Sequence, residues 1–451
     1  MKFDAFHDPT SSVYREPFGA LECGGTVVLR LYHRMNGAAS LRVWDGEERI
    51  TEPFEITEKD GGVLCSFRVP ARRKGIMWYS FRIAAEEGVL YVGAEDGELR
   101  LGCSFSHELP KDFRITVYDK DFAVPEWFRG CITYQIFPDR FYHAADPKED
   151  EAAAYHRQRG RRIDVKRWSE QVDYLPRDGA KHYSPTDFYL GNFRGITEKI
   201  PYLKSLGVGA LYLNPIFESP YNHRYSIADY LKPDPLLGSE EDFAAMCAAL
   251  KKEGIRVILD GVFSHTGADS VYFNRDGHYP NSGACQNAPS PYDSWYDFRH
   301  FPDDYRSWWG FRELPEVNEL DPGYMEFIAG VLKKWMMLGA SGWRLDVADE
   351  LPDEFIKFLR GTVKSIDPEA VLIGEVWEDA AVKTGDTDGR GTVARRGYTD
   401  GDMLDGVMDY PFADAVCDFL TTQMFFDNDM LYSFLYRLQS AGIHIPVLAG
   451  I

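Results

Sequence analysis

Two short apolar segments, each with one acidic residue near its carboxyl end, constrain the fold of this chain more than any other feature. The first, Gly342–Val347, contains Asp346. The second, Ile373–Trp377, contains Glu375 and follows after a stretch long enough for a helix. Apolar segments that alternate with helical patterns are typical of parallel strands in an α/β fold. We therefore expect two neighbouring strands whose acidic residues lie side by side.

The spacing of these acidic residues indicates a chemistry. Side chains alternate along a strand, so Arg344 and Asp346 point to the same face. Adjacent strands lie ~4.8 Å apart, and enzymes that cleave glycosidic bonds with retention place two carboxyl groups ~5–5.5 Å apart. Asp346 and Glu375 are therefore candidates for a nucleophile and an acid/base. The structural alternative is two buried strands that end in acids, with Arg344 as the ion-pair partner of Asp346.

The net charge of −21 restricts the partners of the chain. This charge repels phosphate backbones and anionic lipids, so we expect no nucleic acid and no membrane as partner, and a neutral substrate fits better. No segment has the pattern of a secretory leader or of a membrane span. The 7 cysteines are scattered without metal-type spacing. We expect no zinc site and a reduced, cytoplasmic protein.

The chain changes its pattern near residue 123. Before it, Thr26–Leu31, Leu41–Trp44 and Trp78–Ile83 have the composition of strands, with Gly-containing turns between them. Several short strands at this spacing predict an all-β sandwich, which we place at residues 1–122. After it, strands alternate with helices, which favours a (β/α) barrel over an open sheet. We place this barrel at residues 123–451, with a domain inserted at about 266–320.

Six segments have the composition of barrel strands, and most are followed by a helical pattern. They are Ile132–Phe137, Gly209–Pro215, Ile255–Asp260, Gly342–Val347, Ile373–Trp377 and Gly406–Tyr410. The acidic residues stand at the carboxyl ends of their strands, the face on which barrels carry out chemistry.

Several of these segments resemble motifs of the α-amylase family of glycoside hydrolases (glycoside hydrolase family 13). Asp260–His265 resembles the DxVxxH element of that family, and Gly342–Asp346 resembles its GxRxD element. Glu375–Trp377 resembles the segment that carries the proton donor. Asn222–Tyr225, followed by an Ala-Asp-Tyr sequence, resembles the neopullulanase/cyclomaltodextrinase branch. That branch also has an N-terminal β-sandwich, so the resemblance covers nearly the whole chain.

The resemblance implies a role for each residue of the catalytic motifs. Asp346 would be the nucleophile that forms a glycosyl ester, and Glu375 would protonate the leaving oxygen and later activate water. Arg344 would hold Asp346 ionised, since an opposite charge lowers the pKa of a carboxyl group. Asp260 would brace the site.

Other residues of these motifs would bind the substrate. His265 would donate to hydroxyl groups of the sugar, with a satisfied loop histidine as the alternative. Tyr225 would stack on the sugar ring, and His223 and Trp377 are further substrate-binding candidates. For Tyr225 and Trp377, packing is the alternative.

The chain departs from the family pattern after Glu375. The family has a third acid in a His-Asp pair, whereas His444 is followed by Ile445. Pro446–Ile451 begins a seventh strand at most, so we expect a truncated (β/α)8 barrel with strands seven and eight missing. Many members of the family bind calcium. Asp146 and Asp150 are candidate ligands, with a solvated acidic loop as the alternative.

The resemblance implies a retaining hydrolase of α-1,4 and possibly α-1,6 glucosidic bonds in cyclomaltodextrins, pullulan or maltooligosaccharides, with no required cofactor. One alternative is an α-amylase or oligo-α-glucosidase that acts on linear substrates. Another is a non-catalytic glucan-binding protein or an inactive fragment, which the missing third acid favours. Related enzymes often dimerise through the N-terminal domain, so a homodimer is also expected.

Overall fold

The computed structural model describes residues 5–86, 88–94, 103–176, 183–286 and 289–377, and the shorter pieces 380, 383–387, 393–394, 397–398, 401–422 and 447–448. The chain forms two compact units. One contains Met1–Ala123, Trp377–Met403 and Asp409–Ile451, and the other contains Val124–Val376 and Leu404–Met408. The domain boundaries expected from the sequence stay predictions. No helix among the described residues is both long and apolar enough to cross a membrane.

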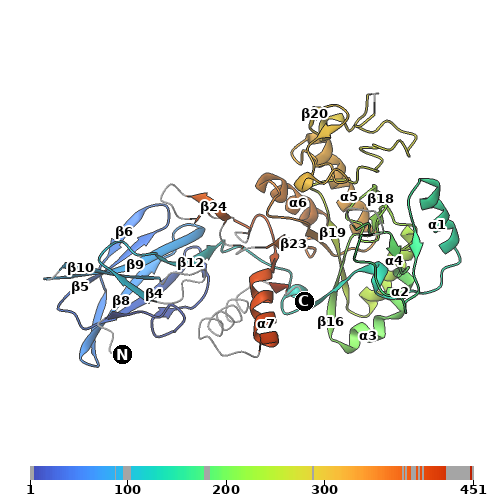
Figure 1. The fold of residues 1–451 in the computed structure, drawn as a ribbon. Helices are drawn as coiled ribbons and strands as arrows, with labels where there is room; N and C mark the ends of the chain where they lie inside the picture. The colour runs from blue at the N-terminus through green and yellow to red at the C-terminus, as the bar shows by residue number, and fades with distance from the viewer. Residues whose placement is uncertain are drawn as a thin grey trace. The chain divides into compact units, whose positions relative to one another are not determined.

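The first unit contains two β-sheets, whose strands are drawn mostly in blue in Figure 1. One sheet has the order β1-β4-β8-β7, with β2 paired to β4; its strands are Ala5–Phe6, Thr26–His33, Gly62–Pro70, Glu55–Lys59 and, for β2, Arg15–Glu16. The other has the order β11-β10-β9-β12-β3, with β5 paired to β9 and to β6; these are Cys103–Ser106, Gly88–Ala94, Gly75–Ala85, Phe113–Tyr118, Leu21–Glu22, Gly37–Trp44 and Glu48–Thr51.

A shared apolar core joins these two sheets into a sandwich. In β4, the alternate residues Val27, Leu29 and Leu31 are buried, as the period of a strand with one covered face requires. They belong to one core cluster with Tyr79 and Phe81 of β9 in the other sheet. The all-β sandwich predicted from the sequence is confirmed.

The chain after Ala123 forms a sheet with the order β13-β16-β19-β22-β23-β26-β27. The strands are Ile132–Ile136, Val208–Leu213, Arg256–Gly261, Gly342–Leu345, Val371–Val376, Gly406–Asp409 and Val447–Leu448. The first five pair in parallel, each with the next strand of the order. All six predicted strands are present, and the order ends in β27, where the sequence predicts the start of a seventh strand.

Helices between consecutive strands cover the sheet, as in a barrel (Figure 1). They are α2 Phe193–Glu198, α3 Ile200–Ser205, α4 Glu240–Lys252, α5 Pro322–Met337 and α6 Asp353–Ile366, and α7 Tyr410–Thr422 follows β26. Helix α3 packs against β16, α4 against β19 and α6 against β23. Local sequence sets the ends of α4: Ser239 forms a capping box with Asp242, and Gly254 follows with a φ of +80°.

Long connections extend from the carboxyl ends of β13, β16 and β19. They contain η2 Pro138–Arg140, α1 Glu149–Gln158, β14 Asp164–Val165 and β15 Asp187–Phe188, then β17 Phe217–Glu218 and β18 Asp229–Pro233, then η3 Asp293–Trp295, β20 Phe298–His300, β21 Asp304–Tyr305 and η4 Trp308–Gly310. The remaining short elements are η1 Glu126–Phe128, β24 Lys383–Thr387 and β25 Val393–Ala394. The connections from β16 and β19 supply polar and aromatic side chains at the end of the sheet where the acidic residues stand.

Candidate active site

Arg344 is the centre of a buried cluster of charged residues. Its Nη1 atom lies 2.7 Å from Oδ1 of Asp260 and 2.7 Å from Oδ1 of Asp346. Its Nη2 atom lies 2.8 Å from Oε1 of Glu375. All four side chains are buried. One guanidinium group therefore serves three carboxylates.

Strand register places these four residues together. Asp260 of β19 is the pairing partner of Arg344 in β22. Leu345 pairs with Gly374 of β23, so Asp346 and Glu375 each come one position later, at the carboxyl ends of their strands. The backbone N–H of Asp346 donates to the carbonyl of Gly261 (3.1 Å), which fixes the residue directly after β22. The structure thus brings together the acids that the sequence pattern places on neighbouring strands.

Two tyrosine hydroxyls donate hydrogen bonds to Oδ2, the second carboxylate oxygen of Asp260. The hydroxyl of Tyr212, from β16, donates to Oδ2 of Asp260 at 2.5 Å, and the hydroxyl of Tyr225 donates to the same atom at 3.0 Å. Asp260 is therefore held by Arg344 and by two tyrosines, which fits a bracing role. Sequence reasoning missed Tyr212, although its position at the end of a predicted strand was a usable signal.

Burial dominates the electrostatics of the cluster. It raises the pKa of Asp346 to about 7, because lost solvation outweighs the attraction of Arg344, and the charges of Asp260 and Glu375 add to the rise. Burial also raises the pKa of Asp260. Arg344 lowers the pKa of Asp346, as expected from the sequence, but desolvation is the larger effect and the net shift is upward.

Glu375 is held through both of its carboxylate oxygens. Oε1 contacts Arg344, and Oε2 accepts a hydrogen bond from the backbone N–H of Val347 at 3.0 Å. Val347 directly follows Asp346 in the chain, so the two candidate catalytic acids are linked by a backbone contact as well as by Arg344. The pair combines a carboxyl group that is half ionised near neutral pH with a second carboxylate in a fixed position, which suits acid/base and nucleophilic work.

Two neutral histidines accompany the cluster. The Nδ1 atom of His265 lies 2.9 Å from the hydroxyl of Ser264, and burial lowers the pKa of His265 to about 4. The Nδ1 atom of His223 accepts from the backbone N–H of Tyr225 at 3.0 Å, and burial likewise lowers its pKa to about 4. The ring of His223 also stacks on Tyr225, with centroids 5.9 Å apart. Neutral imidazoles that are fixed in this way can donate to sugar hydroxyl groups.

An aromatic stack extends from His265 toward solvent. The rings of His265 and Trp308 stack with centroids 5.6 Å apart, and those of Trp308 and Trp309 with centroids 5.1 Å apart. Trp309 is 62% exposed. The two indole N–H groups each donate at 2.9 Å to one oxygen of Glu350. The sequence reasoning missed this stack, although Trp308 and Trp309 stand next to each other in the predicted inserted domain.

The predicted site residues divide into two groups. Arg344, Asp346, Glu375, Asp260 and Tyr225 are joined by direct contacts, and His223 and His265 lie beside them. Trp377 is 40% exposed and belongs to the other compact unit. The role of every one of these residues stays a prediction.

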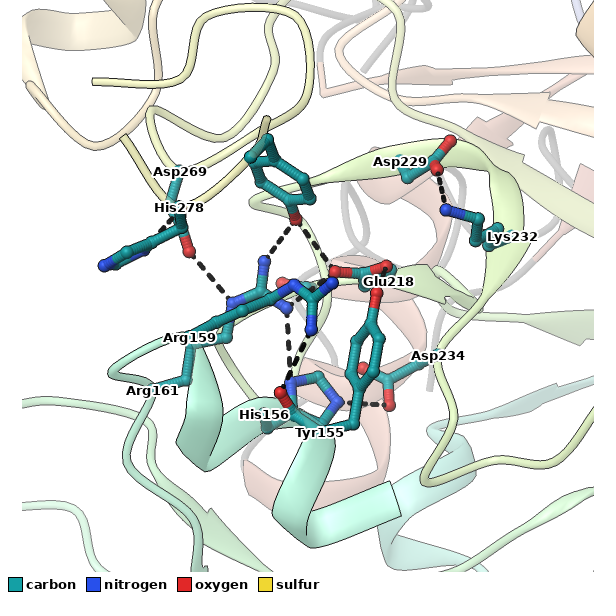
Figure 2. Close-up of polar contacts among 12 residues, drawn as sticks. Tyr155, His156, Arg159, Arg161, Glu218, Asp229, Lys232, Asp234, Asp269 and His278 are labelled. Atoms are coloured by element: carbon teal, nitrogen blue, oxygen red, sulfur yellow. Dashed lines mark hydrogen bonds and ion pairs between the residues drawn. The ribbon is translucent and has the colours of Figure 1, made fainter. Parts of the chain in front are cut away.

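A metal site receives little support from the described residues. Their single group with suitable geometry is Asp269, Asp276 and His278, whose ligand atoms lie within 4.8 Å of one another. However, one oxygen of Asp269 accepts from Arg161 at 2.9 Å and the other lies 3.0 Å from His278 (Figure 2). A guanidinium at this place repels a cation, and calcium prefers oxygen ligands. The group does not fit calcium.

The candidate calcium ligands near α1 have other partners. Oδ1 of Asp146 accepts from the backbone N–H of Lys148 at 2.8 Å, and Asp150 lies in the first turn of α1. An acid in this position stabilises the positive end of the helix dipole without any ion. Calcium therefore stays a family expectation.

Comparison with known proteins decides the family. The sequence profile described as "Alpha amylase, catalytic domain" matches residues 135–441, well over half of the chain. The chain belongs to the α-amylase family. This confirms the resemblance stated above, and the matched segment contains Asp260, Arg344, Asp346 and Glu375.

Relatives of this α-amylase-family chain carry names from one branch. The amylopullulanase of Thermoanaerobacterium saccharolyticum is 34% identical over 463 residues, which cover 94% of this chain and 35% of that protein. Neopullulanase 2 of Thermoactinomyces vulgaris is 33% identical over 308 residues, 67% of this chain and 45% of that protein. The chain thus spans about a third to a half of the length of these curated relatives.

A solved structure agrees with the fold. The type III pullulan hydrolase from Thermococcus kodakarensis superposes with a TM-score of 0.60 at 23% identity, over 97% of this chain and 70% of that chain. At this identity the likeness supports the architecture alone. A barrel of the α-amylase type preceded by a β-sandwich is confirmed.

Proposed function

We propose that this chain is the catalytic part of a retaining α-glucan hydrolase of the neopullulanase/cyclomaltodextrinase type. Its substrates would be cyclomaltodextrins, pullulan or maltooligosaccharides, cleaved at α-1,4 and in part at α-1,6 bonds. The observation that carries the proposal is the pair of carboxylates, Asp346 and Glu375, held on one guanidinium at the ends of adjacent strands. The names of the relatives support the substrate class.

The first step would form a covalent intermediate. A carboxylate oxygen of Asp346 attacks the anomeric carbon while the bond to the leaving oxygen breaks, and Glu375 supplies a proton to that oxygen. Asp346 has to be ionised for this attack. Because its pKa lies at about 7, we expect kcat/KM to rise with pH up to about this value.

The second step would release the sugar. Glu375, now ionised, takes a proton from water, and the water oxygen attacks the anomeric carbon while the ester bond to Asp346 breaks. Two inversions at one carbon give net retention. The contact between Glu375 and the N–H of Val347 keeps the acid/base at a fixed place through both steps.

Substrate contacts would come from the residues around this pair. His265 and His223 are neutral and would donate hydrogen bonds to hydroxyl groups of the sugar. Tyr225 would offer a ring beside Asp260. The stack of Trp308 and Trp309 would receive a further glucose unit, since the faces of sugar rings pack well on aromatic rings.

Azide rescue is the experiment that tests this function. Asp346→Ala should lose hydrolysis of maltotriose, and azide should restore turnover as a glycosyl azide, because the small anion replaces the missing nucleophile. Asp353→Ala, an exposed acid in the first turn of α6, is the matched control and should keep its activity. Release of the β-anomer first from an α-linked substrate would contradict retention and the role of Asp346.

The same assay addresses two alternatives. A preference for linear maltooligosaccharides over cyclodextrins would favour an α-amylase or oligo-α-glucosidase. A non-catalytic glucan-binding protein, the other alternative, would bind maltotriose without any turnover in the wild-type chain. Measuring binding and turnover side by side separates these functions.

Two further parts of the proposal concern the setting of the protein. We place it in the cytoplasm, and the described cysteines Cys23, Cys65, Cys131, Cys247 and Cys285 are free thiols, which suits a reducing compartment. A homodimer through the N-terminal sandwich stays a prediction, which light scattering would test.

A further inference from the structure

Val347, directly after Asp346, has a backbone conformation that is unfavourable for its residue type. Its φ is +42°, in the left-handed region. The other described non-glycine residues with positive φ are Asp60, Leu190, Arg224, Asn274 and Trp309. Val347 is the sole β-branched residue in this described set, and for such residues a positive φ is a true outlier. Strain of this kind persists where the surrounding structure enforces it.

Contacts at both ends of the turn enforce this conformation. Before Val347, the N–H of Asp346 is bonded to the carbonyl of Gly261 (3.1 Å). After it, the carbonyl of Val347 accepts from the N–H of Glu350 (2.8 Å), and the carboxylate of Glu350 binds the indoles of Trp308 and Trp309. The side chain of Val347 is itself only 3% exposed, so packing restricts it as well.

The strained residue also contacts the candidate proton donor. Its N–H donates to Oε2 of Glu375 at 3.0 Å. With residue 350 fixed by the two indoles, relaxation of φ at residue 347 would rotate the preceding peptide group. The N–H would then turn away from Glu375. The strained conformation and the position of the carboxylate are therefore coupled through one peptide group.

We propose that Val347 is a positioning residue for the proton donor: its left-handed backbone directs the N–H at Glu375, and the packed isopropyl group maintains that backbone. The proposal rests on the proposed function. Val347 acts through Glu375 and needs no contact with substrate. Its effect should appear where protonation of the leaving oxygen matters, and should vanish where the leaving group needs no proton.

Two substitutions separate strain from packing. Val347→Ala removes the isopropyl group but keeps a Cβ, so the turn loses the packing that maintains a strained φ. Val347→Gly removes both the packing and the strain, because glycine adopts positive φ readily. We expect the glycine variant to melt at a higher temperature than the alanine variant. Val331, buried in α5, is the control, and there the alanine variant should melt higher.

Kinetics with two leaving groups then test positioning. Val347→Ala should turn over maltotriose ~10-fold more slowly, a part of the 10²–10⁴-fold that general acid catalysis contributes. The same variant should cleave α-maltosyl fluoride within about 2-fold of wild type, because fluoride leaves with little help from an acid. Val347→Gly should recover most of the loss on maltotriose, since it retains the left-handed turn.

The outcomes distinguish this inference from the proposed function. If the wild-type chain cleaves neither substrate, the proposed function fails and the inference fails with it. If wild type cleaves both and Val347→Ala slows both equally, the inference alone is wrong, because the residue is then merely structural. An alanine variant that melts above the glycine variant would also overturn it, since the turn would then carry no strain.

Discussion

Two buried arginines of the second unit each bind several carboxylates, but the pKa shifts of the carboxylates in the two clusters have opposite directions. Arg161 contacts Oδ2 of Asp269 at 2.9 Å and Oε1 of Glu218 at 2.8 Å (Figure 2). It also donates to the hydroxyl of Tyr279 at 2.6 Å. Arg344 contacts three carboxylates and shares its Nη1 atom between two of them. Both arginines are buried, so the two clusters differ in the partners of the arginine and not in its burial.

The carboxylates of the Arg161 cluster are fully supplied with donors. Glu218 accepts from Tyr155 at 2.7 Å and from Tyr279 at 2.8 Å in addition to Arg161, and these contacts together outweigh burial and lower its pKa. In the Arg344 cluster the hydrogen-bond donors do not compensate for the lost solvation of Asp346, and the pKa of Asp346 rises to about 7. A saturated cluster stabilises a fold, whereas a carboxylate poised near neutral pH is suited to chemistry.

The largest expected effect is on catalysis, and it should separate the two clusters. Asp346→Asn and Glu375→Gln should each lower kcat/KM for maltotriose by roughly 10⁴-fold or more, because removal of a nucleophile or its partner removes the reaction path. Glu218→Gln should leave kcat/KM within about 10-fold, since the Arg161 cluster touches no reacting atom. Equal losses in all three variants would show that both clusters serve the reaction.

The second largest expected effect is a loss of stability, and it should follow the substitution of Arg161. Arg161→Met leaves two buried carboxylates without their cation, and breaking a buried pair in this way costs about 3–5 kcal/mol. Arg162→Met is the matched control: its partner Asp164 is at 2.7 Å, but the arginine side chain is 62% exposed, so the loss should stay below ~1 kcal/mol. Thermal unfolding followed by circular dichroism measures both. Similar losses would remove the Arg161 cluster as a stabilising element.

The pH dependence of stability should have opposite signs in the two clusters. The folded-state pKa of Asp346 is raised from 3.8 to about 7, so its contribution is present below pH 3.8 and is lost as pH rises toward 7, by at most ~1.4 kcal/mol per pH unit. Glu218 has a lowered pKa, so its contribution is present above pH 4.5 and is lost as pH falls through the folded-state pKa.

Melting curves of two variants over pH 3 to 8 test these signs. Asp346→Asn should gain stability over wild type at pH 8 and lose that advantage near pH 4. Glu218→Gln should be less stable than wild type at pH 7 and approach it in acid. Parallel curves for wild type and Asp346→Asn would show that this carboxyl group titrates normally.

The sequence predicts one of these clusters and not the other, for a physical reason. Asp346 and Glu375 follow apolar strands, and alternation together with parallel pairing places them beside Arg344 without any knowledge of distant contacts. Arg161 lies 57 residues from Glu218 and 108 from Asp269. Its partners come from the long connections after β16 and β19, whose paths only the folded chain determines.

The sequence pattern predicts neither the backbone strain at Val347 nor the desolvation of Asp346. Nothing in the residues around Val347 predicts a positive φ, because valine disfavours it and only the tertiary contacts of Glu350 and Glu375 enforce it. The net pKa shift of Asp346 depends on how completely the fold excludes water. The sequence names the charged partner, Arg344, but it does not give the size of the opposing desolvation.

The smallest expected effects compare one histidine from each cluster. His278 lies 3.0 Å from Asp269 with its side chain 32% exposed, so His278→Gln should change stability by less than ~1 kcal/mol and should leave kcat/KM unchanged. His265 is buried and neutral beside the Arg344 cluster. His265→Gln should remove one neutral hydrogen bond to the sugar, worth about 0.5–1.5 kcal/mol, and so lower kcat/KM for maltotriose about 3–10-fold. Steady-state kinetics on the two variants at pH 7 measure these effects. An unchanged kcat/KM in His265→Gln would show that His265 is a packed loop residue and does not bind the sugar.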